Sequence, residues 1–125
     1  MMALYFMAKV MIAEDSEPNR RMFRDLLQIE GHQVIAEAKD GVEAVEKFNE
    51  TKPDVLLLDI AMPEKDGISA LREILASTPD ARVIMISAKE GFSTISKCMS
   101  MGAQAYLIKP FRSEDMAKAI KMTLA

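Results

Sequence analysis

The chain has 125 residues, half of them apolar and 28% charged, with a formal net charge of -3. This length suits one domain, and so apolar a composition excludes an intrinsically disordered chain. Acids and bases are interspersed, which argues against direct binding to nucleic acid, and no run approaches the roughly 20 apolar residues that a membrane span needs.

The first seven residues are expected to be an N-terminal extension, with the domain occupying residues 8–125. Met7-Ala8-Lys9 resembles a second translation start. The segment before it lacks a basic region and is too short for a signal peptide. A single cysteine, Cys98, cannot form an internal disulfide, which suits a reducing cytoplasm. We therefore expect a cytoplasmic protein without membrane insertion.

Four apolar runs along the chain each stop at polar residues that can do chemistry. Short unbroken apolar runs are typical of strands buried on both faces, as in parallel sheets. The runs and the residues that follow them are Val10–Ala13 before Glu14 and Asp15, Val55–Leu58 before Asp59, Val83–Ile86 before Ser87, and Tyr106–Ile108 before Lys109.

The segments between these runs have helical patterns. Glu17–Glu30 carries Pro18 in its first turn and stops at Gly31, and Val34–Ala36 is a further short strand. The second helix is expected to begin at a capping box of Asp40 with Glu43, and the third after Asp66-Gly67. The fourth is expected to end at Gly102, and the fifth to begin at Ser113 as a cap. The residues expected on the inner faces are Met22, Phe23, Leu26, Leu27, Val42, Val45, Phe48, Ile68, Leu71, Leu75, Phe92, Ile95, Met99, Met116, Ala119 and Ile120.

Strand and helix therefore alternate five times. This alternation predicts an α/β fold, with a parallel sheet covered by helices on both faces and right-handed crossovers. The carboxyl ends of parallel strands lie at one edge of the sheet, where ligands bind in open α/β folds. The polar residues that end the four runs should meet there.

Three carboxylates, from Glu14, Asp15 and Asp59, would repel one another in one cleft unless a cation joined them. Oxygen ligands with room for water suit Mg²⁺, while Lys109 and the Ser87 hydroxyl could hold phosphoryl oxygens. Asp59 at the centre could act as a nucleophile and form an aspartyl-phosphate. Each residue alone is more often a turn, a cap or a solvated strand end, and only their convergence favours a site.

These motifs together resemble the receiver domain of two-component response regulators, over about residues 8–124. The resemblance depends on order and spacing, which are specific when taken together. The matching segments are Glu14-Asp15, Asp59 to Pro63, Asp66-Gly67, Ser87-Ala88, Gly102-Ala103, Tyr106 and Lys109-Pro110-Phe111.

The resemblance implies a flavodoxin-like (βα)5 three-layer sandwich with strand order 2-1-3-4-5. It also implies that Asp59 is the phosphoacceptor. Asp15 and Asp59 would bind Mg²⁺ directly together with the backbone carbonyl of Ala61, and Glu14 would act mostly through water. The Lys109-Pro110 bond would be cis, although base rates favour trans.

The same resemblance assigns a switch. Lys109 would pair with the phosphoryl group, Ser87 would move to hydrogen-bond it, and Tyr106 would swing into the space that Ser87 leaves. Two positions tune hydrolysis of the acyl phosphate in the family, and here they hold Ala61 and Lys89. Ala61 has no polar side chain to orient water, whereas Lys89 could reach the phosphoryl oxygens. Glu14 also departs from the commoner aspartate.

The implied function is a phosphorylation-activated switch. Its phosphoryl donor would be a sensor histidine kinase or a phosphotransfer protein. The downstream protein would bind the face formed by the fourth helix, the Tyr106 strand and the last helix. We expect a monomer that catalyses only its own phosphorylation and slow dephosphorylation. Because the chain stops soon after the fifth helix, we expect a stand-alone, chemotaxis-like regulator, with a receiver fragment of a larger response regulator as the alternative.

Three other functions fit the sequence less well than the switch. An aspartyl-nucleophile phosphohydrolase would place a second Asp where Ala61 stands. A flavin-binding module would need a Ser/Thr/Gly-rich phosphate loop where the chain has Glu14-Asp15-Ser16-Glu17. A scaffold without phosphorylation is disfavoured because the residue set for phosphorylation is complete.

Overall fold

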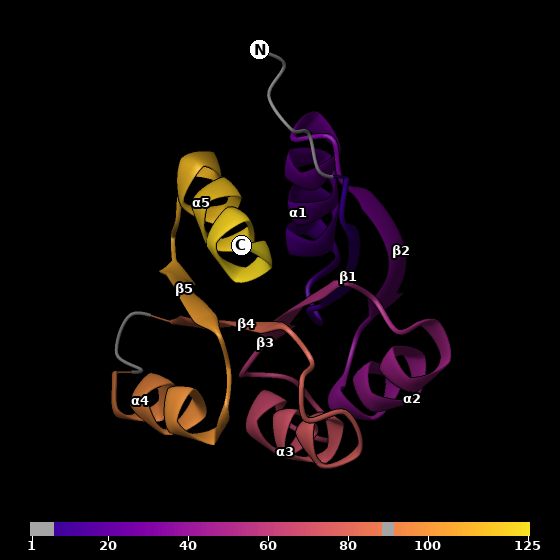
Figure 1. The fold of residues 1–125 in the computed structure, drawn as a ribbon, viewed down its shortest axis with the longest axis vertical. Helices are drawn as coiled ribbons and strands as arrows, with labels where there is room; N and C mark the ends of the chain where they lie inside the picture. Colours follow the sequence, from indigo (N-terminus) through magenta and orange to yellow (C-terminus); the bar gives the residue numbers. More distant parts are fainter. Residues whose placement is uncertain (1–6, 89–91) are drawn as a thin grey trace.

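A computed structural model describes residues 7–88 and 92–125, in which five strands and five helices alternate (Figure 1). The strands are β1 (Lys9–Ala13), β2 (Gln33–Ala38), β3 (Val55–Asp59), β4 (Val83–Ala88) and β5 (Ala105–Lys109). The helices are α1 (Glu17–Ile29), α2 (Gly41–Thr51), α3 (Gly67–Ser77), α4 (Phe92–Met101) and α5 (Ser113–Leu124).

All strand pairs are parallel, in the order β2-β1-β3-β4-β5, which confirms the flavodoxin-like topology. In Figure 1 the strands form a central layer, with α1 and α5 on one side and α2, α3 and α4 on the other. The core accordingly has two parts. Phe23 and Leu27 of α1 pack with Met116 and Ile120 of α5 on one face. The opposite part includes Phe48 of α2 together with residues of α3 and α4.

Three of the helices begin with a side-chain N-cap. The side chains of Ser16, Asp40 and Asp66 each accept a hydrogen bond from a backbone amide three residues later, as N-caps do. Asp40 was predicted to cap, and it does. The carboxylate of Glu43, however, accepts from the amide of Lys39 (3.1 Å).

Ser113 was wrongly expected to cap the last helix. It is the first residue of α5, and the capping position belongs to Arg112. The amide of Arg112 donates to the carboxylate of Asp115 (2.9 Å). The helix start is therefore stabilised from within its first turn, by an acidic side chain near the positive end of the helix dipole.

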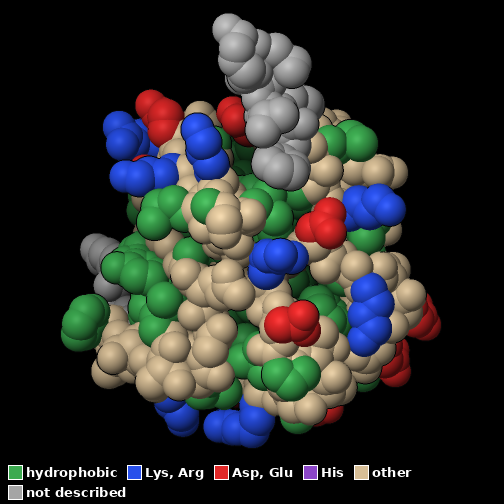
Figure 2. All heavy atoms as spheres, viewed as in Figure 1, with side chains coloured by type: hydrophobic (Ala, Val, Ile, Leu, Met, Phe, Trp, Pro, Cys, Tyr) green, Lys and Arg blue, Asp and Glu red, His purple; other side chains and the backbone are tan. Residues whose placement is uncertain are grey.

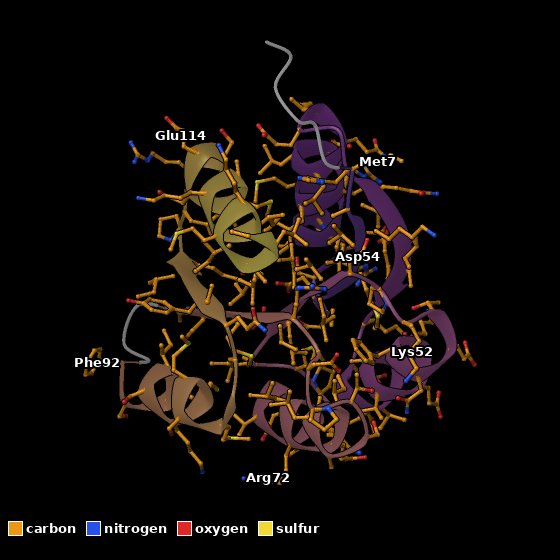
Figure 3. The ribbon with its side chains drawn as sticks, in the orientation of Figure 1. Met7, Lys52, Asp54, Arg72, Phe92 and Glu114 are labelled. Carbon is orange, nitrogen blue, oxygen red and sulfur yellow. The ribbon has the colours of Figure 1, made fainter. Side chains whose placement is uncertain are left out.

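Several residues expected to be buried are exposed. β5 is an edge strand, so Tyr106 is 46% exposed, and the fourth apolar run is not buried on both faces. Phe92, at the start of α4, is 78% exposed and points away from the molecule in Figure 3. Val42 and Met22 are also exposed, whereas Ile95 of α4 is buried as expected. Apolar character alone does not tell which side of a helix faces the sheet.

The remaining expectations concern one peptide bond, Cys98, the N-terminal extension and membrane insertion. The Lys109-Pro110 bond is cis, as the resemblance implied. Cys98 is fully buried, and burial raises the pKa of its thiol, which makes a redox role unfavourable. Met1 to Phe6 lie outside the described residues. Among the residues described, no helix is long and apolar enough to cross a membrane.

His32 should make the stability of the fold depend on pH. Its Nδ1 accepts a hydrogen bond from the amide of Ala8 (3.1 Å), and burial lowers the pKa of the imidazole, against the opposing charge of Glu30. The unfolded chain therefore binds more protons than the folded one once the pH approaches 6.5. We expect the free energy of unfolding to decrease as the pH falls from 6.5 towards the lower pKa of the folded state.

Urea unfolding at a series of pH values measures this effect. Because His32 is the single histidine of the chain, a His32→Gln variant is a direct control. The variant should show a shallower dependence on pH in this window. Equal slopes in both proteins would contradict the prediction.

Candidate functional site

The register of the sheet brings the predicted site residues to one edge. Ala13 lies opposite Leu58, Asp59 opposite Ile86, and Lys109 opposite Ala88. The carboxyl edge of the sheet thus holds the acidic pair after β1, the last residue of β3, the end of β4 and the last residue of β5. The sequence predicted this meeting from the strand ends alone.

Lys109 joins two of the acids. Its Nζ donates to Oδ2 of Asp59 (2.7 Å) and to Oε1 of Glu14 (2.9 Å). Burial alone would lower the pKa of Lys109, but the hydrogen bonds to Asp59 and Glu14 outweigh it and raise the pKa. Lys109 therefore stays an ammonium ion, and it partly compensates the negative charge of the site.

Glu14 is held more tightly than the sequence suggested. Its side chain is 1% exposed, and its second carboxylate oxygen accepts a hydrogen bond from the amide of Ser16 (3.0 Å). Burial raises the pKa of Glu14, and the neighbouring carboxylate of Asp59 acts in the same direction, while the bond from Lys109 opposes both. A second positive charge at the site would therefore favour the ionised form of Glu14.

The three acids fit a divalent cation. One carboxylate oxygen from each of Glu14, Asp15 and Asp59 can be chosen so that all lie within 4.8 Å of one another. Ligands on opposite sides of Mg²⁺ are about 4.2 Å apart, twice the usual Mg–O distance, so this spacing is close to a coordination shell. With all three acids ionised, Lys109 leaves two negative charges, which match a dication. Asp15 is exposed and open to solvent.

Ser87 and Tyr106, the two predicted switch residues, lie on the neighbouring strands β4 and β5. Ser87 is buried, and its hydroxyl donates to the carbonyl of Ala88 (2.9 Å). Tyr106 is exposed on the outer edge of the sheet. Neither side chain hydrogen-bonds to Asp59 in this structure.

Asp59 also has a backbone partner. Its Oδ1 accepts a hydrogen bond from the amide of Ala61 (3.0 Å), so the turn after β3 supports the carboxylate. The methyl group of Ala61 is exposed and adds no polar atom. Lys89, the other predicted tuning residue, lies outside the described residues.

Arg20 of α1 lies next to the site, and the sequence interpretation did not include it. Its guanidinium donates to the backbone carbonyls of Glu14 (2.7 Å) and Asp15 (3.2 Å). The only signal in the sequence is a charged residue five positions after Asp15 on a helix that was predicted to pack against the sheet. Arg21 beside it carries the same charge, so the sequence could not tell which arginine turns inward.

A hydrophobic surface lies at β5, the edge strand of the sheet. Figure 2 shows hydrophobic side chains gathered at the left, between α5 and α4. The residues that line a shallow hollow of about 510 Å³ on this surface include Met99, Tyr106, Phe111, Lys118 and Met122. We call this surface the α4-β5-α5 face.

Comparison with known proteins gives consistent results. Residues 10–121 match the family described as the response regulator receiver domain. The chain is 40% identical to the chemotaxis protein CheY of Bacillus subtilis over 116 residues, covering 93% of this chain and 97% of that protein. It is 38% identical to the transcriptional regulatory protein PdtaR of Mycobacterium tuberculosis, covering 94% of this chain but 57% of that protein.

A solved structure shows a similar fold. The complex of CheX, CheY, BeF3 and Mg²⁺ from Borrelia burgdorferi contains a chain that matches with a TM-score of 0.90 and 32% sequence identity. The match covers 94% of this chain and 89% of that one.

Proposed function

Because this chain belongs to the response regulator receiver domain family, we propose that it is a phosphorylation-activated signalling switch that accepts a phosphoryl group on Asp59. The observation that carries the proposal is the contact set of Asp59. This nearly buried carboxylate lies between the ammonium of Lys109 and the acids Glu14 and Asp15. Such a set can hold a dianionic group that is formed on Asp59.

The chemistry is an in-line displacement. A carboxylate oxygen of Asp59 forms a bond to phosphorus, and the bond from phosphorus to the imidazole nitrogen of a phosphohistidine breaks, with its electron pair remaining on the imidazole. Lys109 neutralises charge on the phosphoryl oxygens. The amide of Ala61 holds Asp59 in place through its second oxygen.

Glu14, Asp15 and Asp59 would hold Mg²⁺, with the carbonyl of Ala61 as a further ligand. When bound, the ion would neutralise charge on the acids and on the transferred group. The oxygen-only donor set and its two uncompensated negative charges support this assignment. Glu14 is already hydrogen-bonded through both carboxylate oxygens, which suits a role through water.

The added charge would then act on Ser87 and Tyr106. The hydroxyl of Ser87 would leave the carbonyl of Ala88 and donate to a phosphoryl oxygen, and Tyr106 would turn inward. The exposed ring of Tyr106 lies on the α4-β5-α5 face, so its movement would change that surface. Phosphorylation would thereby shift the population of a two-state element.

The partners follow from the same scheme. A sensor histidine kinase or a phosphotransfer protein would donate the phosphoryl group, and a downstream protein would bind the α4-β5-α5 face. The similarity to CheY proteins supports a chemotaxis-like role for a cytoplasmic monomer. Apart from its own phosphorylation and slow dephosphorylation, the domain would catalyse no reaction. The partial coverage of PdtaR supports the alternative, in which such a domain is part of a larger regulator.

A mass measurement tests the proposal. The protein is incubated with acetyl phosphate and Mg²⁺, and its intact mass is measured. A gain of one phosphoryl group that is absent in Asp59→Asn is the expected result. No gain, under conditions in which a control receiver is phosphorylated, would overturn the proposed function.

Ala61 allows a prediction about the phosphoryl lifetime. An asparagine there would place an amide beside Asp59, where it could orient a water molecule for hydrolysis. We expect Ala61→Asn to shorten the lifetime several-fold, measured as decay of the phosphorylated mass after the phosphodonor is removed. Glu64→Asn, in the same loop, is the matched control and should leave the lifetime unchanged. An unchanged lifetime in Ala61→Asn would contradict the prediction.

A further inference from the structure

We propose that Arg20 is a positioning residue for the metal ligands, holding the turn between β1 and α1 so that Glu14 and Asp15 face Asp59. The inference rests on the proposed function, since it concerns the same site. It assigns a role to a residue that would not itself touch the cation or the phosphoryl group. The turn is the short segment between Ala13, the end of β1, and Glu17, the start of α1.

The turn is held at its two ends by backbone hydrogen bonds, and the carbonyl of Ser16 accepts one of them from the amide of Arg20 (2.9 Å) in α1. On its inner side, the amide of Glu14 donates to the carbonyl of Ala38 (2.9 Å) in β2. On its outer side, Nη1 of Arg20 donates to the carbonyls of Glu14 (2.7 Å) and Asp15 (3.2 Å). These contacts hold successive peptide groups of the turn, which determine where the two carboxylates point.

Arg20 is itself held in place. Its Nε lies 3.5 Å from a carboxylate oxygen of Glu37 in β2, and the other oxygen of Glu37 binds Arg24 at 2.6 Å. The side chain of Arg20 is only 16% exposed, whereas that of the adjacent Arg21 is 66% exposed. The planar guanidinium carries donors on separate nitrogens, so Nη1 reaches the two carbonyls while Nε faces Glu37. A lysine has its three donors on one nitrogen and does not match this spacing. Arg20 thus links β2, α1 and the turn.

Two effects of Arg20 on cation binding have opposite signs. By Coulomb's law, removing a positive charge near three acids strengthens the binding of a cation. Releasing the turn weakens binding, because the ligands lose their fixed orientation. Loss of groups that orient metal ligands typically weakens metal binding by about tenfold or more. The sign of the change in Arg20→Gln therefore separates positioning from charge.

The test compares Arg20→Gln, Arg20→Lys and Arg21→Gln with the original protein. The Kd of Mg²⁺ is measured by isothermal titration calorimetry, under conditions in which far-UV circular dichroism shows each variant to be folded. We expect the Kd to rise about tenfold in Arg20→Gln and to rise less in Arg20→Lys. It should stay unchanged in Arg21→Gln, which removes the same charge from an exposed position.

A second readout addresses a merely structural role. In metal-free protein, the backbone amide resonances of Glu14, Asp15 and Ser16 should shift in Arg20→Gln but not in Arg21→Gln. If Arg20 only stabilised the fold through Glu37, Arg20→Gln would lower the free energy of unfolding and leave the Kd of Mg²⁺ unchanged. That result, or tighter binding, would overturn the inference. Absence of Mg²⁺ binding by the original protein would instead contradict the proposed function.

Discussion

Replacing Lys109 with methionine is expected to slow phosphorylation of Asp59 by about a hundredfold, the usual effect of removing one group that stabilises developing charge. The ammonium lies 2.7 Å from Asp59 and 2.9 Å from Glu14, so the variant leaves two nearly buried acids without their shared cation. The free energy of unfolding without metal should also fall. We expect a loss of about 2 kcal/mol, smaller than for a fully buried pair because the Lys109 side chain is 31% exposed.

Two measurements check this prediction. The rate of phosphorylation by acetyl phosphate is followed by intact mass, and unfolding by urea is followed with and without Mg²⁺. Mg²⁺ should stabilise Lys109→Met more than the original protein, because the ion meets the two acids without a competing ammonium. Lys121→Met removes one exposed positive charge far along α5 and serves as the control. An unchanged rate in Lys109→Met would show that Lys109 does not stabilise the transferred group.

Replacing Gly67 with alanine is expected to disturb the phosphoacceptor through its backbone. Gly67 is the buried first residue of α3, and its amide donates to the carbonyl of Ile60 (2.8 Å). A Cβ atom there would lie 2.2 Å from the carbonyl oxygen of Asp59 and 2.7 Å from Cα of Ile60. The backbone must move to accept it. We expect the free energy of unfolding to fall by about 3 kcal/mol and phosphorylation to slow in the molecules that remain folded.

Gly41→Ala is the matched control for this variant. At Gly41 a Cβ atom would lie 1.9 Å from the carbonyl oxygen of Lys65, so an equally severe clash occurs at the start of α2. Both variants should lose stability in urea unfolding. Phosphorylation per folded molecule should fall further in Gly67→Ala, whose clash is with Asp59 itself. Equal rates in the two variants would mean that the position of the Asp59 backbone does not limit the reaction.

The pattern of apolar runs predicted the sheet and its functional edge. Each run in β1, β3 and β4 is buried on both sides, and such a strand must be apolar along its whole length. The polar residue at its end therefore marks both the end of the strand and the start of the site. This is why the sequence alone predicts that Asp59 and the acids before α1 lie at the site. The strand order came from the family resemblance.

Other features depended on how the elements pack. β5 has an apolar sequence like that of a central strand, but it lies at the edge of the sheet, so Tyr106 is exposed. Phe92 is large and apolar like a core residue, but it is exposed. It is the first residue of α4 and is directed away from the molecule (Figure 3). The sequence of a helix does not determine how the helix is oriented about its axis. Its packing against neighbouring elements determines which of its apolar residues are buried.

By itself, the sequence determined the alternation of strands and helices and the identity of the residues at the carboxyl edge, because burial and periodicity are properties of each segment. Only the tertiary structure decided that Lys109 joins Glu14 to Asp59, and that Arg20 rather than Arg21 reaches the turn after β1. The physical reason is that these contacts join residues from different elements. Lys109 and Glu14 are 95 residues apart in the chain, and their contact exists only after the sheet has formed.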